Sequence, residues 1–286
     1  MKQEKTRLFV IADPTASHQV ALVKALLLAK LADCQIHAFL CVHREQQEDD
    51  KYPSRKDFKQ HTLTDAEQWL DEQLEPCRTA GVPYTKQIVW KSQWHDAALR
   101  AIAKSECDLV IKSSYHHSKS KRFYSSTSDF NLMRHCASPI LFTHPTQEWE
   151  SNELLACVDL ESTDVGHARL NDVITRDARA MASIAGMNLH IAAAHQGGID
   201  PDSLPIESHG GEVSAEQLAE LYDVDASRIH LRRGETVATL SAICDEIDPC
   251  IVIMGTLART GISGQLIGNT AEKLLDRVEA DVLTVN

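Results

Sequence analysis

The sequence predicts an α/β protein made of two tandem, doubly wound domains, each with a five-stranded parallel sheet of the Rossmann-like type. Three observations carry this prediction: an internal repeat, a regular alternation of short apolar runs with helical periodicity, and a length of 286 residues. That length suits two ordinary domains and is too short for three of average size.

The repeat appears as pairs of similar runs at nearly constant spacing. Two pairs recur at an offset of 142 residues, namely 107–114 (CDLVIKSS) with 249–256 (PCIVIMGT), and 138–143 (SPILFT) with 281–285 (DVLTV). Upstream, the run that ends at Asp13 matches the run that ends at Asp159, at an offset of 146 residues. A repeat of this length corresponds to a whole domain. We therefore predict one domain over residues 1–147 and a second over 148–286.

The second copy shows the element pattern most clearly. Its continuous apolar runs predict buried strands at 154–159, 188–195, 228–233, 250–256 and 282–286. Between them, apolar residues recur every three or four positions and predict helices at 168–186, 214–222, 236–248 and 269–279. Strands of this kind alternating with helices indicate a parallel sheet covered on both faces.

Composition excludes several classes of function. The net charge is −12, and it is concentrated in the second copy: residues 1–150 hold 20 Lys and Arg against 19 Asp and Glu, whereas residues 151–286 hold 9 against 22. A nucleic-acid-binding surface should be basic, so we predict no nucleic-acid partner. No apolar run reaches the ~18 residues of a membrane span, so we predict no membrane association. Eight scattered cysteines without a C-x-x-C pair indicate reduced, mostly buried thiols and a cytoplasmic location.

The stretch 254–270 (MGTLARTGISGQLIGNT) joins a predicted strand to a predicted helix and contains four of the twelve glycines. Glycines in this place let backbone N–H groups approach phosphate oxygens. The stretch has neither the G-K-[ST] of a P-loop nor a G-x-G-x-x-G fingerprint. A purely structural interpretation also stands, because Asn269 with Glu272 makes a helix N-cap with a capping-box partner.

The spacing of Gly255, Ala258 and the Gly268-Asn269 pair resembles the G-x2-G-x9-G-[S/T] nucleotide loop of the universal stress protein family. Asp159 at the end of the first strand and the closing strand DVLTV are similar to further motifs of that family, and the resemblance covers nearly the whole chain as a tandem member. It implies adenine-nucleotide binding, with ATP as the ligand, by Asp159, Ala194, His195, Met254, Gly255, Ala258, Gly268, Asn269 and Thr270.

Two positions depart from the family pattern. Ala258 replaces a glycine, which would cost about 1–2 kcal/mol if the backbone there needs a positive φ. Asn269 replaces Ser or Thr, but asparagine can still donate a hydrogen bond to phosphate. Asp159 can either hold the ribose or cap the helix that follows it. For Asp13 we predict the capping role.

The first copy lacks the glycine loop. The 142-residue offset places non-glycine residues at the four signature positions: Ser113, His116, Ser126 and Thr127. The substituted stretch is basic, and an anion could be held there by the side chains of Lys112, Lys119, Lys121 and Arg122; the alternative is a solvated loop. The cysteine and histidine residues of this copy suggest a zinc site, with the candidate ligands Cys41, His43, His116 and His117. Zinc needs three or four convergent ligands, and we predict no metal.

We predict a non-enzymatic stress-response protein whose second domain binds an adenine nucleotide. The alternatives are an interaction or scaffold protein that binds no nucleotide, and a slow ATP hydrolase with a metal at Asp159. The family resemblance also implies that the runs 138–143 and 281–285 lie antiparallel across an intramolecular pseudo-dyad, or that they join two chains in a homodimer. Such pairing would protect two edge strands.

Overall fold

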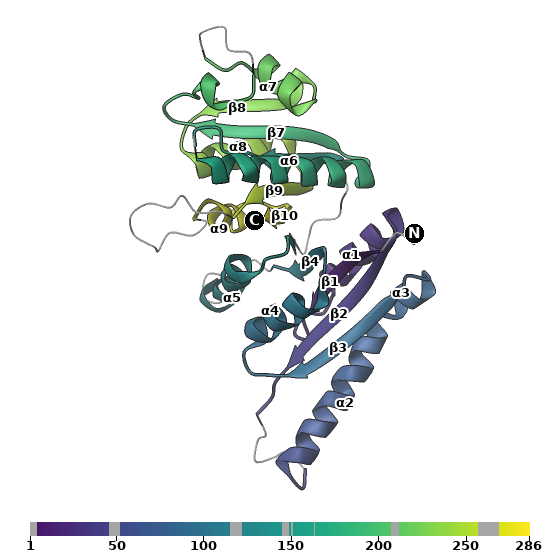
Figure 1. Cartoon of the computed structure of the whole chain (residues 1–286). Coiled ribbons are helices and arrows are strands. Elements are labelled where there is room, and N and C mark those ends of the chain that lie inside the picture. Colours follow the sequence, from purple (N-terminus) through teal and green to yellow (C-terminus); the bar gives the residue numbers. More distant parts are fainter. Residues whose placement is uncertain are drawn as a thin grey trace. The chain divides into compact units, whose positions relative to one another are not determined.

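The computed structural model describes residues 5–45, 52–114, 122–144, 149, 151–162, 164–206, 212–256 and 269–286. The chain divides into two compact units, Met1–Pro145 (unit 1) and Thr146–Asn286 (unit 2). Each unit is an α/β domain with its own parallel sheet (Figure 1). The predicted fold class is confirmed.

Unit 1 alternates strands and helices along the chain. Its strands are β1 (Thr6–Ala12), β2 (Cys34–Val42), β3 (Tyr84–Trp90), β4 (Leu109–Ser113) and β5 (Ile140–Thr143). Its helices are α1 (Val20–Leu31), α2 (Arg55–Gln73), α3 (Glu75–Thr79), α4 (Trp94–Ser105) and α5 (Arg122–His135). The strands pair in parallel in the order β3-β2-β1-β4-β5.

Unit 2 repeats this plan. Its strands are β6 (Glu153–Cys157), β7 (Asn188–His195), β8 (Ile229–Arg233), β9 (Ile251–Gly255) and β10 (Asp281–Val285). Its α-helices are α6 (Val165–Ala185), α7 (Ala215–Tyr222), α8 (Thr236–Ile247) and α9 (Asn269–Leu275), with 3₁₀ turns at Pro201–Ser203 and Ala226–Arg228. The strand order β8-β7-β6-β9-β10 is again parallel throughout and corresponds element by element to that of unit 1.

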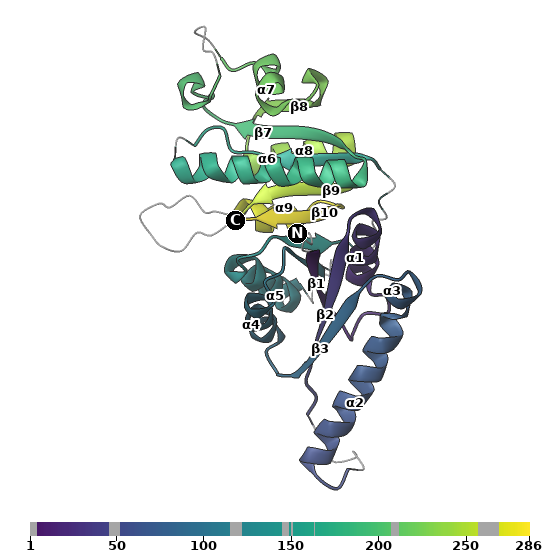
Figure 2. The ribbon, with the colours of Figure 1, turned by 45° about the vertical axis from the view of Figure 1, so that its right-hand side comes forward.

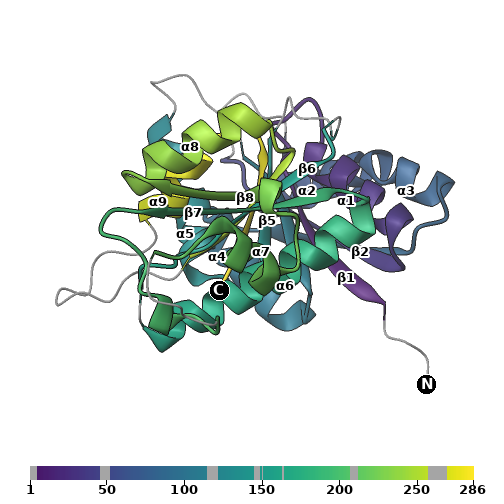
Figure 3. The ribbon, with the colours of Figure 1, turned by 90° about the horizontal axis from the view of Figure 1, so that it is seen from above.

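Right-handed crossovers place the helices of each unit in two layers. In unit 1, α1 and α2 pack on one face of the sheet, and α4 and α5 contact each other on the opposite face. In unit 2, α6 lies along one face of the strands (Figure 2), and seen from above the strands β7 and β8 separate α8 from α6 and α7 (Figure 3). The central strands are therefore buried on both sides, as their continuous apolar sequences predict.

The helices begin where the sequence offers caps. Ser54 accepts a hydrogen bond from the Asp57 N–H at the start of α2, and Asp164 accepts one from the Gly166 N–H at the start of α6. Ser214 and Gln217 form a reciprocal capping box on α7. The α6 helix ends at Gly186, whose φ of 69° is the left-handed conformation that glycine adopts without steric penalty.

Candidate functional site

In both units the strand order reverses at the centre of the sheet, between β1 and β4 in unit 1 and between β6 and β9 in unit 2. Ligands of open parallel sheets bind at such a point, beyond the carboxyl ends of the strands. In unit 2 the candidate residues meet at this edge: Asp159 follows β6, Ala194 and His195 end β7, and Met254 and Gly255 end β9.

Four of the predicted nucleotide-binding residues lie within or directly after a segment that is not described. Asn269 and Thr270 begin α9, and the Thr270 side chain is exposed. Ala258 and Gly268 lie outside the described residues, so the loop geometry that would cradle phosphates is not described.

Asp159 organises the turn that leaves β6. Its Oδ1 atom accepts hydrogen bonds from the N–H groups of Glu161 (3.1 Å) and Ser162 (3.3 Å). Its backbone is clamped by Asn171 of α6: the Asp159 N–H donates to Asn171 Oδ1 at 3.0 Å, and Asn171 Nδ2 donates to the Asp159 carbonyl at 2.7 Å. These hydrogen bonds hold the Asp159 carboxyl group at the switch point. Helix α6 is capped by Asp164, so the alternative role of Asp159 as the cap of this helix is wrong.

Glu161 joins the loop after β6 to the loop after β7. Its Oε1 atom accepts hydrogen bonds from the backbone N–H groups of Gln196 (2.7 Å) and Gly197 (3.0 Å). Arg233, at the end of β8, donates through Nε to the Gln196 carbonyl at 3.1 Å. The rim beside Ala194 and His195 is therefore held by charged side chains that the sequence pattern did not single out.

Gly255 has a packing reason to be glycine. A Cβ atom at this position would lie 2.2 Å from Cδ2 of Leu170, which packs on β9 from helix α6. Met254, one residue earlier, is 3% exposed and belongs to the core. The described start of the loop is thus explained by close helix–strand packing, whatever ligand the loop takes.

Unit 1 has a cavity of about 700 Å³ at the corresponding edge of its sheet. Its lining includes the turn after β1, the end of β2, the start of α4 and the end of β4, with Asp13, Cys41, Trp94, Lys112 and Asp129 among the side chains. A volume of this size is within the range of small-molecule sites.

The turn after β1 uses the same device as the turn after β6. Asp13 accepts hydrogen bonds at Oδ1 from the Thr15 N–H (2.8 Å) and the Thr15 hydroxyl (2.7 Å). Gln19 clamps the Asp13 backbone, accepting from its N–H at 3.0 Å and donating to its carbonyl at 2.7 Å. Asp13 thus fixes the turn after β1, but the N-cap residue of α1 is Gln19, so the predicted role of Asp13 as the cap of this helix is wrong.

Lys112 of the predicted anion site is engaged inside unit 1. Its Nζ atom lies 2.7 Å from Asp129 Oδ1, donates to the Ser113 carbonyl at 2.8 Å and sits 5.2 Å from the centroid of the Trp94 ring. The side chains of Lys112 and Asp129 are 14% and 5% exposed. The Lys112 charge is thus balanced within the protein. Arg122 begins α5, and Lys119 and Lys121 lie outside the described residues, as do His116 and His117.

The thiols give no sign of nucleophilic chemistry. None of the eight cysteines, which all lie in the described part of the chain, forms a disulfide, and six are buried. Burial raises the pKa of Cys41 at the unit 1 cavity, and burial together with the nearby Cys244 raises that of Cys157 at the end of β6 well above its usual value. Both thiols therefore stay protonated near neutral pH, and a thiol is a poor nucleophile.

The described residues also bear on the metal and membrane hypotheses. Within the described ranges, no group of three or more His, Cys, Asp or Glu side chains is arranged to hold a metal ion. None of the helices in the described part of the chain is long and apolar enough to cross a membrane.

Two tandem, doubly wound parallel sheets with candidate site residues at their carboxyl edges define a Rossmann-like class of α/β protein. A model of the universal stress protein family matches residues 5–144 and 177–286. The chain belongs to the universal stress protein family.

Several relatives match nearly the whole length of the chain. The chain is 25% identical over 296 residues to universal stress protein E of Escherichia coli K12, covering 97% of this chain and 93% of that protein. It is 22% identical to a universal stress protein E homolog of Haemophilus influenzae, covering 97% and 96%. A crystal structure of a universal stress protein from Archaeoglobus fulgidus matches in fold with a TM-score of 0.72 at 15% identity, covering 98% of each chain. A functionally unknown protein from Pseudomonas aeruginosa PAO1 also gives a TM-score of 0.72, at 25% identity and 98% and 92% coverage.

Proposed function

We propose that this chain is a non-enzymatic, cytoplasmic stress-response protein whose unit 2 binds an adenine nucleotide, ATP, at the carboxyl edge of its sheet. The observation that carries the proposal is the meeting of Asp159, the end of β7 and the end of β9 at the switch point. Membership in the universal stress protein family supports the stress-response role.

In the proposed complex, each element has a distinct task. The Asp159 carboxylate, held by Glu161 and Ser162, accepts hydrogen bonds from ribose hydroxyls. The adenine lies against the end of β7 at Ala194 and His195. The phosphates contact backbone N–H groups of the stretch 254–270, from Met254 and Gly255 through Ala258 to Gly268, Asn269 and Thr270, because oriented N–H groups bind anions without a basic side chain.

The proposal makes the protein a binder and not an enzyme. Hydrolysis of ATP needs an activated water and stabilisation of the charge on the transferred phosphoryl group. The two cysteines near the carboxyl edges have raised pKa values and so supply no nucleophile. A slow hydrolase with a metal at Asp159 is the competing function, and a scaffold that binds no nucleotide is the other.

Calorimetric titration of the full chain with ATP and ADP tests the proposal. Asp159→Asn keeps an oxygen that can cap the loop but removes the charge, and we expect it to weaken binding about tenfold, which is ~1.4 kcal/mol. Asp13→Asn is the matched control and should leave the affinity unchanged. No heat at millimolar nucleotide would favour the scaffold. Phosphate release above background that disappears in Asp159→Asn would favour the hydrolase.

The unit 1 cavity supports a second, separate ligand site. Its rim carries Arg44 and Lys91, while its interior charge pair, Lys112 with Asp129, is balanced. We propose a small anion-bearing molecule that is not a nucleotide, because the glycine loop is missing there. Thermal-shift measurements with pyrophosphate and with AMP test this: stabilisation by pyrophosphate that is lost in Lys91→Met supports the site, and an equal effect of both ligands on wild type and variant contradicts it.

We also propose that β5 and β10, each an edge strand within its own unit, pair antiparallel inside one chain, with a homodimer as the intermolecular alternative. Unpaired edges invite aggregation, and pairing would remove two of them. Hydrogen exchange tests this: β5 and β10 amides should be as protected as those of β1 and β6, at a protein concentration where the chain is monomeric. Exchange as fast as in the outer strands β3 and β8 would contradict it.

A further inference from the structure

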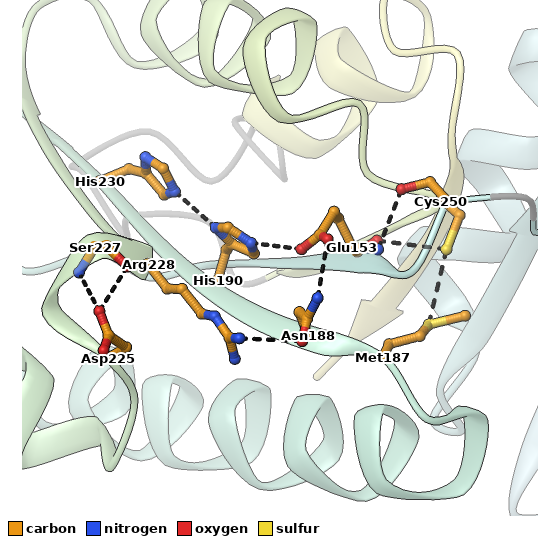
Figure 4. Close-up of polar contacts among 10 residues, drawn as sticks. Glu153, Met187, Asn188, His190, Asp225, Ser227, Arg228, His230 and Cys250 are labelled. Atoms are coloured by element: carbon orange, nitrogen blue, oxygen red, sulfur yellow. Dashed lines mark hydrogen bonds and ion pairs between the residues drawn. The ribbon is translucent and has the colours of Figure 1, made fainter.

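Unit 2 contains a continuous hydrogen-bond network of polar side chains at the amino ends of its strands (Figure 4). This edge of the sheet is opposite to the edge with the proposed nucleotide site. Glu153 Oε2 lies 2.7 Å from His190 Nε2, and His190 Nδ1 lies 2.9 Å from His230 Nε2. The two imidazole rings are stacked with their centroids 5.2 Å apart. This hydrogen-bond network thereby links three neighbouring strands, β6, β7 and β8.

At its glutamate end, the network is held in place by further hydrogen bonds. Asn188 Nδ2 donates to Glu153 Oε1 at 2.9 Å, and Arg228 Nη2 donates to Asn188 Oδ1 at 3.1 Å. Burial opposes ionisation of Glu153, but the hydrogen bonds from Asn188 and His190 outweigh it and lower the pKa of this carboxyl. Glu153 is therefore a carboxylate near neutral pH.

The carboxylate of Glu153 determines which ring nitrogens of His190 and His230 carry protons. His190 must carry a proton on Nε2, because a lone pair there would face the negative Glu153 oxygen. Neutral His190 then presents a lone pair at Nδ1, which accepts the Nε2–H of His230. One extra proton can bind His230 at Nδ1 without breaking either hydrogen bond. A second proton must bind His190 Nδ1, and it would then face the Nε2–H of a charged His230.

The surrounding charges do not offset the repulsion between the two charged imidazole rings. The charges that act on His230 are those of His190, of Arg232 in β8 and of Glu246 in α8. Arg228, before β8, acts on Glu153, and the Cys250 thiol donates to the Glu153 backbone carbonyl at 3.4 Å. Arg232 and Glu246 neutralise each other in a two-point ion pair, with Nη1 to Oε1 at 2.6 Å and Nη2 to Oε2 at 2.5 Å. Burial, and after it the charges on His190 and Arg232, lower the pKa of His230.

We propose that Glu153, His190 and His230 form a proton-operated latch, which holds the outer strand β8 on β7 while at most one imidazole is charged and releases β8 when both are. Two stacked imidazolium rings repel each other and have lost the hydrogen bond between them, so the His230 ring must turn away. His230 lies in β8, opposite Ala192 of β7 in the register. When the His230 ring turns away from His190, the pairing of β8 with β7 is therefore weakened. The latch makes unit 2 responsive to mild acid.

Unit 1 supplies a matched internal control. His37 of β2 has the same place as His190, since it pairs in register with Phe9 of β1 as His190 pairs with Leu155 of β6. Its ring nitrogens contact Thr85 Oγ1 at 2.7 Å and Gln87 Oε1 at 3.4 Å, which are neutral groups. A single extra proton on His37 therefore meets no second imidazolium, and β3 should not respond to acid in the same way.

Hydrogen exchange of the full chain, with chelator present, tests the latch. Between pH 7.5 and 5.0, after correction for intrinsic exchange rates, we expect the protection of the β8 amides to fall at least fivefold more than that of β3. His230→Gln, which copies the Gln87 arrangement of unit 1, should abolish the difference. Equal responses of β8 and β3 in the wild type would overturn the proposal.

Nuclear magnetic resonance of the imidazoles gives a second test that does not depend on a variant folding. Two strongly interacting imidazoles lose their protons in two separate macroscopic steps. We expect the signals of the coupled pair, His190 and His230, to share two steps. Independent single-step titrations of His190 and His230 would overturn the proposal, as would displacement of their protons by added Zn²⁺ at neutral pH.

Discussion

The two units place different chemistry at the same point of the same fold. Unit 1 has an ion pair between Lys112, near the end of β4, and Asp129, in the middle of α5. In unit 2 the residues 142 positions later are Met254 and Ala271, which are 3% and 1% exposed. The fold accepts either a salt bridge or an apolar contact there because both fill the space between the sheet and the helix that follows. Only unit 1 thereby gains charged groups in the wall of its cavity.

The next position shows the same contrast. Ser113 Oγ accepts the Ala21 N–H at 3.1 Å and so satisfies a donor in the first turn of α1. In unit 2 this position is Gly255, and Leu170 of α6 occupies the space that a side chain would need. The contrast teaches that a glycine at the start of a ligand loop can be required by helix packing, so its presence alone does not identify a binding site.

The largest effect should come from breaking the ion pair. Asp129→Ala leaves the Lys112 charge poorly hydrated and without its partner, and we expect unit 1 to lose about 3–5 kcal/mol of its free energy of unfolding. Denaturant titration measures this. Installing the unit 2 residues together, Lys112→Met with Asp129→Ala, should return the stability to within about 1 kcal/mol of wild type. A double variant as unstable as the single one would show that the two sites are not interchangeable.

A smaller effect should come from filling the space at Gly255. Gly255→Ala puts a Cβ atom into Leu170, and we expect unit 2 to lose about 1–3 kcal/mol through overpacking. Adding Leu170→Ala should relieve the clash, so the two changes should be non-additive in a double-mutant cycle. Additive losses would contradict the packing explanation.

Removing the Glu161 carboxylate should have a smaller effect again. Glu161→Gln keeps one acceptor for the Gln196 and Gly197 N–H groups but loses the charge, whereas Glu161→Ala loses the acceptor as well. We expect the alanine variant to lose about 1 kcal/mol, since these groups can bond to water instead. Proteolysis of the loop after β7 should become faster in the alanine variant, and unchanged cleavage would contradict the proposed role of Glu161 in the rim.

The smallest effect should be the acid sensitivity that distinguishes unit 2 from unit 1. Because the folded-state pKa of His230 is lowered, the unfolded chain binds the proton more readily. Stability is therefore complete above the unfolded value of about 6.5 and falls as the pH drops from there to the folded-state pKa. The lowered pKa of Glu153 removes further stability only at lower pH, below about 4.3.

Denaturant titrations of the wild type and of His230→Gln at pH 7.5, 6.0 and 5.0 measure this effect. The variant should lose the decline between pH 6.5 and 5.0 and keep the one at lower pH. A wild type whose stability is flat across the upper range would contradict the lowered pKa of His230.

Much of the fold was predictable because the signals were local. The strand predicted at 188–195 occurs at that position, and the helix predicted at 168–186 is observed as Val165–Ala185. It begins three residues earlier because Asp164 caps it, a signal present in the sequence but not used. At the carboxyl edge of unit 2, the gathering of Asp159 with the ends of β7 and β9 follows from the strand order β8-β7-β6-β9-β10. The sequence predicted the parallel sheet but not this order.

The parts that sequence reasoning missed depend on contacts between distant residues. Asn171 clamps the Asp159 backbone from the second turn of α6, and Glu161 reaches the loop after β7. Their sequence signal was weak, since amides and carboxylates are common on helix surfaces and in loops. The pairing of His190 with His230, which lie 40 residues apart, could be found only once the strand register was known.

The sequence by itself determined that this protein is a tandem α/β molecule of the universal stress protein family, because apolar periodicity, loop spacing and repetition are properties of the chain order. Tertiary structure decided which polar groups meet. It paired Lys112 with Asp129, placed Leu170 over Gly255 and linked Glu153 to two histidines. The physical reason is that hydrogen bonds and ion pairs act over about 3 Å, so they form only after hydrophobic packing has fixed the strand register and the helix positions.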